Sequence, residues 1–122
     1  MSDTLIYHLI RRTDWQAALA ERVYGGTADD LRDGFLHFST ASQVAESAAR
    51  HRAGVPDLLL IGIEPKTLSD NLKWQTSRGG QKFPHLYGAL PTELVVRVEE
   101  LPLTKDGYHL FPDDIPSFKA LP

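Results

Sequence analysis

The stretch DLLLIGI at residues 57–63 decides the fold. Its aliphatic run has the length of a strand, and Pro65 ends it because proline donates no hydrogen bond to a sheet. Such a run predicts a buried strand. LIYHLI at residues 5–10, which is rich in β-branched, aromatic and apolar side chains, predicts a second buried strand.

Capping sequences predict two main helices. Thr13-Asp14-Trp15-Gln16 has the S/T-x-x-E/Q spacing, in which the hydroxyl and the amide satisfy backbone N–H groups reciprocally. It predicts a helix over roughly 14–23 that Gly25-Gly26 stops. The same spacing in Thr40-Ala41-Ser42-Gln43 predicts a helix that runs to about His51. Between them, TADDLRDG is expected to form one helical turn that Gly34 closes.

The remaining segments predict strands, turns and one long loop. FLHFS and LVVRVEEL are expected to be strands, KDGY a hairpin turn, and YHLF a short last strand. Residues 66–83 show neither the helical nor the strand period and predict a long loop, which in a small domain is usually functional or disordered. The tail FPDDIPSFKALP contains three prolines and is expected to extend over the surface.

This order of segments favours an α+β fold with a mixed or mostly antiparallel sheet, because regular helices no longer separate the strands after residue 63. We expect a single domain over residues 1–122, with a core at about 5–101 and a C-terminal extension at 102–122.

Charge and composition exclude several function classes. The formal net charge is −3 without a run of Lys and Arg, which disfavours bulk nucleic-acid binding. The absence of cysteine removes disulfides, thiolate nucleophiles and cysteine-based metal sites. No apolar run is long enough to span a bilayer, and the N-terminus lacks the pattern of a signal peptide. We therefore expect a soluble, cytoplasmic protein with no membrane partner.

Three histidines lie in apolar or aromatic surroundings and are candidates for a site: His8, His37 and His85. Strand alternation places His37 on one face with Phe35 and Ser39. One alternative is that these histidines are core residues satisfied by backbone carbonyls, and another is that they ligate a metal. No local metal-binding spacing is present, and the chain has only one His-x-Ser/Thr unit, His37-Phe38-Ser39, where two-histidine phosphoesterases use two.

The segment SRGGQK at residues 77–82 has the ingredients of a phosphate cradle. Its glycines expose backbone N–H groups, and Arg78 and Lys82 add charged donors, although the sequence lacks the ending of a P-loop. Trp74, Phe83 and Tyr87 bracket it with rings suited to stacking on a base or a nicotinamide. A flexible surface loop that these rings anchor to the core is the alternative.

The order of four motifs resembles a small bacterial family, the domain-of-unknown-function family nine-five-two. The motifs are IYHLI followed by a Trp, DGFLHFSTASQ, DLLLIGI, and a Trp that eight residues separate from FPHLYGALP. The resemblance covers about residues 5–101. It implies a fold similar to that of ADP-ribosyltransferases, with a split sheet around an NAD cleft.

The resemblance also implies roles for individual residues. His8 resembles the residue that holds the NAD ribose, and Ser39 and Thr40 resemble the strand end that supports the nicotinamide ribose. The family commonly has Glu after the Trp of the long loop, whereas this sequence has Gln75, which supplies no negative charge to a developing cation.

From these observations we expect an ADP-ribosyltransferase-like protein that binds NAD or a related phosphorylated nucleotide. NAD is the candidate substrate or ligand, and the sequence does not identify a cofactor. The candidate catalytic residues are His37, His85 and Gln75. The candidate ligand-binding residues are His8, Ser39, Thr40, Trp74, Arg78, Lys82 and Tyr87. The alternatives are a non-catalytic binding or interaction module, for which Gln75 is the best argument, and a histidine-ligated metalloenzyme.

Overall fold

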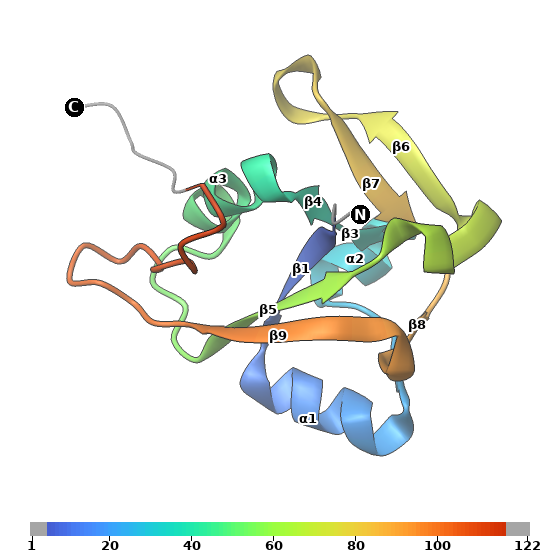
Figure 1. The fold of residues 1–122 in the computed structure, drawn as a ribbon, viewed down its shortest axis with the longest axis horizontal. Helices are drawn as coiled ribbons and strands as arrows, with labels where there is room; N and C mark the ends of the chain where they lie inside the picture. The colour runs from blue at the N-terminus through green and yellow to red at the C-terminus, as the bar shows by residue number, and fades with distance from the viewer. Residues whose placement is uncertain (1–4, 117–122) are drawn as a thin grey trace.

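A four-stranded antiparallel sheet forms the centre of the protein (Figure 1). The structure is a computed structural model, and it describes residues 5–116, apart from the side chains of Ser69 and Arg78. The strands of this sheet are β1 (Ile6–Arg11), β4 (Ser39–Thr40), β5 (Leu58–Ile63) and β9 (Val95–Leu101). They lie in the order β4-β1-β5-β9. Every residue of β5 is buried, as the run DLLLIGI predicts.

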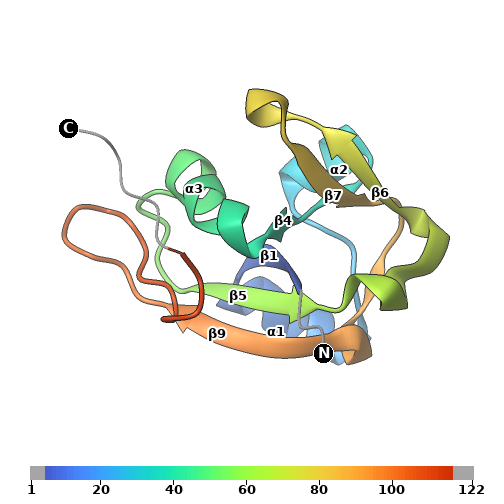
Figure 2. The same cartoon turned by 45° about the horizontal axis from the view of Figure 1, so that its top comes forward.

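Two smaller antiparallel sheets extend this centre. One pairs β2 (Val23–Tyr24) with β8 (Leu90–Pro91). The other contains β3 (Leu36–His37), β7 (Lys82–Leu86) and β6 (Leu72–Thr76), in that order. Figure 2 shows the β6–β7 hairpin standing away from the four-stranded sheet, on the same side of β1 and β5 as the helix α3 (Ala41–His51).

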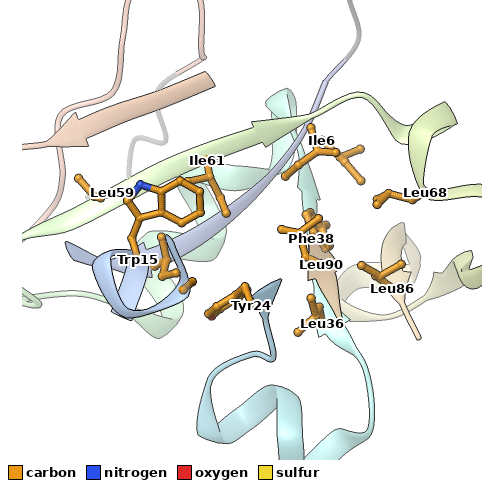
Figure 3. Packing of buried hydrophobic residues seen from close by; sticks show 13 residues of the cluster. Ile6, Trp15, Tyr24, Leu36, Phe38, Leu59, Ile61, Leu68, Leu86 and Leu90 are labelled. Carbon is orange, nitrogen blue, oxygen red and sulfur yellow. The ribbon is translucent and has the colours of Figure 1, made fainter. Parts of the chain in front are cut away.

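Helices cover opposite faces of the central sheet. The helix α1 (Arg12–Glu21) packs on the face of Leu59 and Ile61, and α3 packs on the face of Leu58 and Leu60. Figure 3 shows Trp15 of α1 against Leu59 and Ile61, with the same cluster continuing toward the smaller sheets. Alternation of side chains along β5 therefore divides the core into two apolar clusters, which explains why this strand has no polar face.

Capping explains two of the three α-helices. In α3 the side chain of Gln43 accepts a hydrogen bond of 3.0 Å from the backbone N–H of Thr40, as predicted. The short helix α2 (Ala28–Asp33) begins with a capping box between Thr27 and Asp30 and ends at Gly34, whose φ of 86° is the left-handed conformation expected there.

The predicted start and end of the first helix are wrong. The helix α1 begins at Arg12, and no side chain caps it. The backbone N–H of Arg12 instead donates to the carbonyl of Asp57 at 3.0 Å, because β1 and β5 already hold these two residues together. The helix ends at Glu21, before Gly25-Gly26, and the next residues pair with β8 as β2.

The prediction of a long loop over residues 66–83 is also wrong. The short 3-10 helices η1 (Pro65–Asn71) and η2 (Arg78–Gly80) and the strands β6 and β7 occupy this region. A further 3-10 helix, η3 (Thr92–Leu94), precedes β9. No residue of β6 is buried, whereas the four residues of β7 after Lys82 all are, so neither strand shows the apolar alternation by which a strand is recognised in a sequence.

The segment after β9 is partly confirmed. Residues 104–107 form the expected turn, with the N–H of Gly107 donating to the carbonyl of Thr104 at 3.1 Å. YHLF is not a strand, because its pairing is limited to an isolated bridge between Leu103 and His109. The tail does not simply extend over the surface, since Ile115 is buried in the α3 cluster; the predicted extension beyond residue 116 lies outside the described residues.

Over residues 5–116 these elements confirm an α+β protein with antiparallel sheets, and the three α-helices of this part of the chain are the two predicted main helices and the predicted helical turn. Among residues 5–116, no helix has the length and apolar character needed to cross a membrane. The fold brings the β6–β7 hairpin, α2 and residues 7–9 of β1 around one cavity, which is the candidate site.

Candidate functional site

A cavity of about 280 Å³ opens between β1, α2, α3 and the β6–β7 hairpin. The three histidines singled out in the sequence, His8, His37 and His85, all line this one cavity. The other residues that line it are Tyr7, Leu9, Asp29, Asp30, Arg32, Asp33, Phe38, Ser39, Ser47, His51, Arg52, Ser77 and Phe83. Polar and ionisable side chains therefore make up most of the lining, and the rings of Phe38 and Phe83 add apolar surface.

Asp30 is the buried anchor of the site. It occupies the third position of α2, and its side chain is 2% exposed. One carboxylate oxygen accepts from the backbone N–H and the hydroxyl of Thr27, at 2.7 and 3.0 Å. The other accepts from the backbone N–H of His37 at 3.0 Å and from its Nδ1 at 2.5 Å. The carboxylate that caps α2 thus also fixes the position and the ring orientation of His37.

His37 lies between two carboxylates. Its Nδ1 donates to Asp30, and its Nε2 lies 3.0 Å from a carboxylate oxygen of Asp33. The hydrogen bond to Asp30 raises the pKa of His37, outweighing burial, and the charge of Asp33 raises it further. Burial alone would raise the pKa of Asp30, but the hydrogen bond from the His37 side chain and those from the backbone N–H groups of Thr27 and His37 hold that pKa well below its usual range. The arrangement favours an imidazolium bridging two aspartates.

His85 lies opposite His37 in a different electrostatic setting. The two residues are direct partners of β7 and β3, and their ring centroids are 5.7 Å apart. Burial lowers the pKa of His85, and the neighbouring charge of His37 adds to this effect. The ring of Phe35 stacks on His85 with 4.1 Å between centroids. His85 is therefore the neutral member of the pair, and it complements the more basic His37.

Gln75 fixes the tautomer of His85. Its side-chain oxygen lies 2.8 Å from Nδ1 of His85 and accepts a second hydrogen bond of 2.8 Å from the hydroxyl of Tyr87. Because an amide oxygen only accepts, Nδ1 of His85 carries the proton, and Nε2 is the basic nitrogen.

His8 has both ring nitrogens engaged within the protein. Its Nδ1 donates to the carbonyl of His37 at 2.7 Å, and its Nε2 accepts from the hydroxyl of Tyr24 at 2.9 Å. Burial lowers the pKa of His8 against the opposing charge of Asp30, which lies 3.7 Å away. Burial also raises the pKa of Tyr24. His8 is thus a neutral residue that ties β1 to β2 and β3.

The cavity gathers only part of the predicted site. Of the residues expected to bind ligand or act in catalysis, His8, His37, Ser39 and His85 line it, and Ser39 shares a 3.0 Å hydrogen bond with Ser47. The roles predicted for these residues are not tested by their positions. Thr40 is the residue before α3, as its capping sequence indicates.

Four other predicted residues, Gln75, Tyr87, Trp74 and Lys82, do not line the cavity. Gln75 contacts His85 through the hydrogen bond described above, and Tyr87 donates to Gln75. Trp74 pairs with Pro84, so alternation directs it to the opposite face of the hairpin from Gln75. Lys82 is exposed, and its carbonyl accepts from the side chain of Gln43 at 2.9 Å. The side chain of Arg78 lies outside the described part of the chain.

The sequence analysis did not identify the acidic and arginine side chains of the cavity, and Asp30 and Asp33, which hold His37, are the most important of them. The signal was present in TADD, because Thr27 and Asp30 have the spacing of a capping box. We expected only a helical turn there. Nothing local to the sequence indicates that the capping carboxylate also accepts from His37, seven residues later.

The described residues 5–116 contain no group of three or more histidine and acidic side chains arranged to hold a metal ion. This observation does not favour the metalloenzyme alternative, although three histidines line one cavity. His8 in particular has its two nitrogens in protein hydrogen bonds rather than directed at a common point.

Comparisons with known proteins find relatives with the same fold. The model of the family described as "Protein of unknown function (DUF952)" matches residues 9–98. The crystal structure of protein CC0527 from Caulobacter crescentus is 42% identical, with a TM-score of 0.89, and covers 92% of this chain and 98% of that one. The solution NMR structure of CC0527 is 43% identical, with a TM-score of 0.77, and covers 85% of this chain and 90% of that one. No curated protein matches the chain.

Proposed function

The chain belongs to the family described as "Protein of unknown function (DUF952)", and for this member we propose binding of NAD or a related phosphorylated nucleotide in the His37 cavity. One observation carries the proposal: a half-exposed histidine, fixed by a buried carboxylate, faces a cavity that a second, neutral histidine shares. Pairs of titratable groups with opposite pKa shifts are typical of acid and base chemistry.

The size of the cavity supports one end of a dinucleotide as its occupant. At about 280 Å³ it is near the lower limit of ligand pockets. Phe38 and Phe83 supply apolar surface beside the polar groups. We propose that the nicotinamide and its ribose enter the cavity, and that the phosphates lie toward its exposed side.

The proposed reaction is cleavage of the bond between nicotinamide and ribose, which is what the resemblance of the sequence motifs implies. The nitrogen of nicotinamide keeps the bonding pair and leaves as the neutral molecule. Water or an acceptor hydroxyl forms the new bond to ribose C1′ and passes its proton to Nε2 of His85. Once the substrate displaces the carboxylate of Asp33, His37 donates a hydrogen bond from Nε2 to an oxygen of the substrate, and Asp30 keeps that donor in place.

Calorimetry with NAD and ADP-ribose tests the binding. We expect heat of binding for the wild type and its loss in His37→Ala, while His109→Ala, which changes a histidine away from the cavity, binds as the wild type does. Circular dichroism checks that both variants are folded. No binding heat for the wild type at millimolar ligand would remove the proposal.

A non-catalytic binding module is the second candidate, and Gln75 favours it. In the position where the family commonly has Glu, Gln75 accepts hydrogen bonds from His85 and Tyr87 but cannot stabilise a developing positive charge. This candidate predicts that NAD binds without release of nicotinamide. Chromatographic detection of free nicotinamide above the rate in buffer would exclude it.

A further inference from the structure

Charges of alternating sign run along one side of the cavity, in the order His37, Asp33, Arg32, Asp29, Arg52, and all five side chains line it. Asp33 lies 3.0 Å from Nε2 of His37 through one oxygen and 3.1 Å from Nε of Arg32 through the other. Asp29 lies 3.3 Å from Arg32 through one oxygen and 3.8 Å from Arg52 through the other. Each carboxylate thus bridges two cationic groups.

This geometry is what a phosphoryl group requires. A phosphoryl group presents several negatively charged oxygens, and guanidinium groups and protonated imidazoles bind them through charge-assisted hydrogen bonds. The carboxylates of Asp33 and Asp29 both contact Arg32. Two anionic groups that share one guanidinium in this way resemble two linked phosphoryl groups. The carboxylates of Asp33 and Asp29 therefore occupy positions in which an anion finds hydrogen-bond donors already in place.

The two carboxylates differ from Asp30 in how firmly they are held. Asp30 is buried and accepts four hydrogen bonds, whereas the side chains of Asp33 and Asp29 are 34% and 49% exposed. Ion pairs of exposed side chains contribute little to stability, so a ligand can displace them at small cost. Both residues lie on α2, a helix of only six residues, and changes in their side-chain rotamers need no change in the backbone.

We propose that His37, Arg32 and Arg52 form a binding site for a diphosphate group, and that Asp33 and Asp29 compete with this group for the same donors. The inference rests on the proposed function in one respect, because it assigns the diphosphate of a nucleotide to this side of the cavity. It differs from the cradle predicted at residues 77–82, because Lys82 does not line the cavity.

Asp33→Asn is the variant that distinguishes competition from support. If Asp33 competes, the amide removes a negative charge from the anion position, and inorganic pyrophosphate binds about two- to tenfold more tightly. Arg32→Gln removes a donor and weakens binding by a similar factor. Glu93→Gln is the matched control for charge, because it removes one carboxylate from an exposed position outside the cavity.

The experiment is isothermal titration with pyrophosphate at pH 6 and low ionic strength, where His37 keeps its proton in every variant. Tighter binding in Asp33→Asn than in Glu93→Gln, with weaker binding in Arg32→Gln, supports the site. Equal or weaker binding in Asp33→Asn overturns it, and so does the absence of pyrophosphate binding in the wild type. A shift of the His37 ring signals in NMR spectra on addition of pyrophosphate supports its location, and unchanged signals exclude it.

Titrations with ADP-ribose separate this inference from the proposed function. If pyrophosphate behaves as expected and neither ADP-ribose nor NAD binds, the diphosphate site stands and the nucleotide proposal fails. If ADP-ribose binds and its affinity does not change in Asp33→Asn or Arg32→Gln, the nucleotide proposal stands and the diphosphate site fails.

Discussion

Replacement of Asp30 by asparagine is expected to destabilise the protein strongly and to lower the pKa of His37. The carboxylate accepts four hydrogen bonds, two on each oxygen, from Thr27 and His37. An amide keeps one oxygen and turns the other into a donor, so one of the two pairs of donors loses its acceptor. At about 1.5–3 kcal/mol for each hydrogen bond to a charged group, the loss amounts to about 3–6 kcal/mol. This is a large fraction of the stability of a small domain.

The sign of the pH dependence follows from the two pKa shifts. The lowered pKa of Asp30 contributes stability that is complete above its unfolded value, about 3.9, and is lost as the pH falls through the folded pKa. The raised pKa of His37 contributes stability that is complete below its unfolded value, about 6.5, and is lost as the pH rises through the folded pKa. The difference between wild type and Asp30→Asn is therefore largest at about pH 5 and smaller at about pH 8.5.

Urea unfolding followed by the fluorescence of the buried Trp15 measures this difference, and NMR titration gives the pKa of His37. Asp106→Asn, at an exposed turn, is the control and is expected to change stability by less than about 0.5 kcal/mol. The reasoning is refuted if Asp30→Asn unfolds within about 0.5 kcal/mol of the wild type at pH 5. An unchanged pKa of His37 in this variant would refute it as well.

Three further predictions test the site and the core. NMR titration of the wild type is expected to place the pKa of His37 above 6.5, because of its hydrogen bond to Asp30, and that of His85 below 6.5, because of burial; the reverse order would contradict the proposed roles. Gln75→Glu keeps the acceptor for His85 and adds a negative charge, so the pKa of His85 should rise by about one unit or more in the same experiment, and no rise would show that the contact is not made in solution. Leu60→Ala, at a fully buried position of β5, is expected to cost about 2–5 kcal/mol in urea unfolding, against less than about 0.5 kcal/mol for the exposed Leu31→Ala; similar losses in the two variants would contradict the assignment of the core.

Several parts of the candidate site were predictable from local pattern. His37 and Ser39 line the same cavity, but they do so from two strands in different sheets, β3 and β4, and not from the single strand FLHFS that we predicted. Phe35, which we expected on the same face, does not line the cavity, whereas the three histidines of the apolar segments do. The partners of these residues were not predictable in this way. His37 pairs with His85 across β3 and β7, and β7 shows no period of two because all four of its residues after Lys82 are buried.

Features that depend on residues close together in the chain follow from the sequence alone. They are the buried strand at 58–63, the helix that Gln43 caps, and the turn at Gly34. Only the tertiary structure decided the start of α1, where the carbonyl of Asp57 replaces a side-chain cap, and the role of Asp30. The physical reason is the same in both cases. A backbone or carboxylate group takes the partner that the packed fold brings within hydrogen-bonding distance, and that partner can be distant in the sequence.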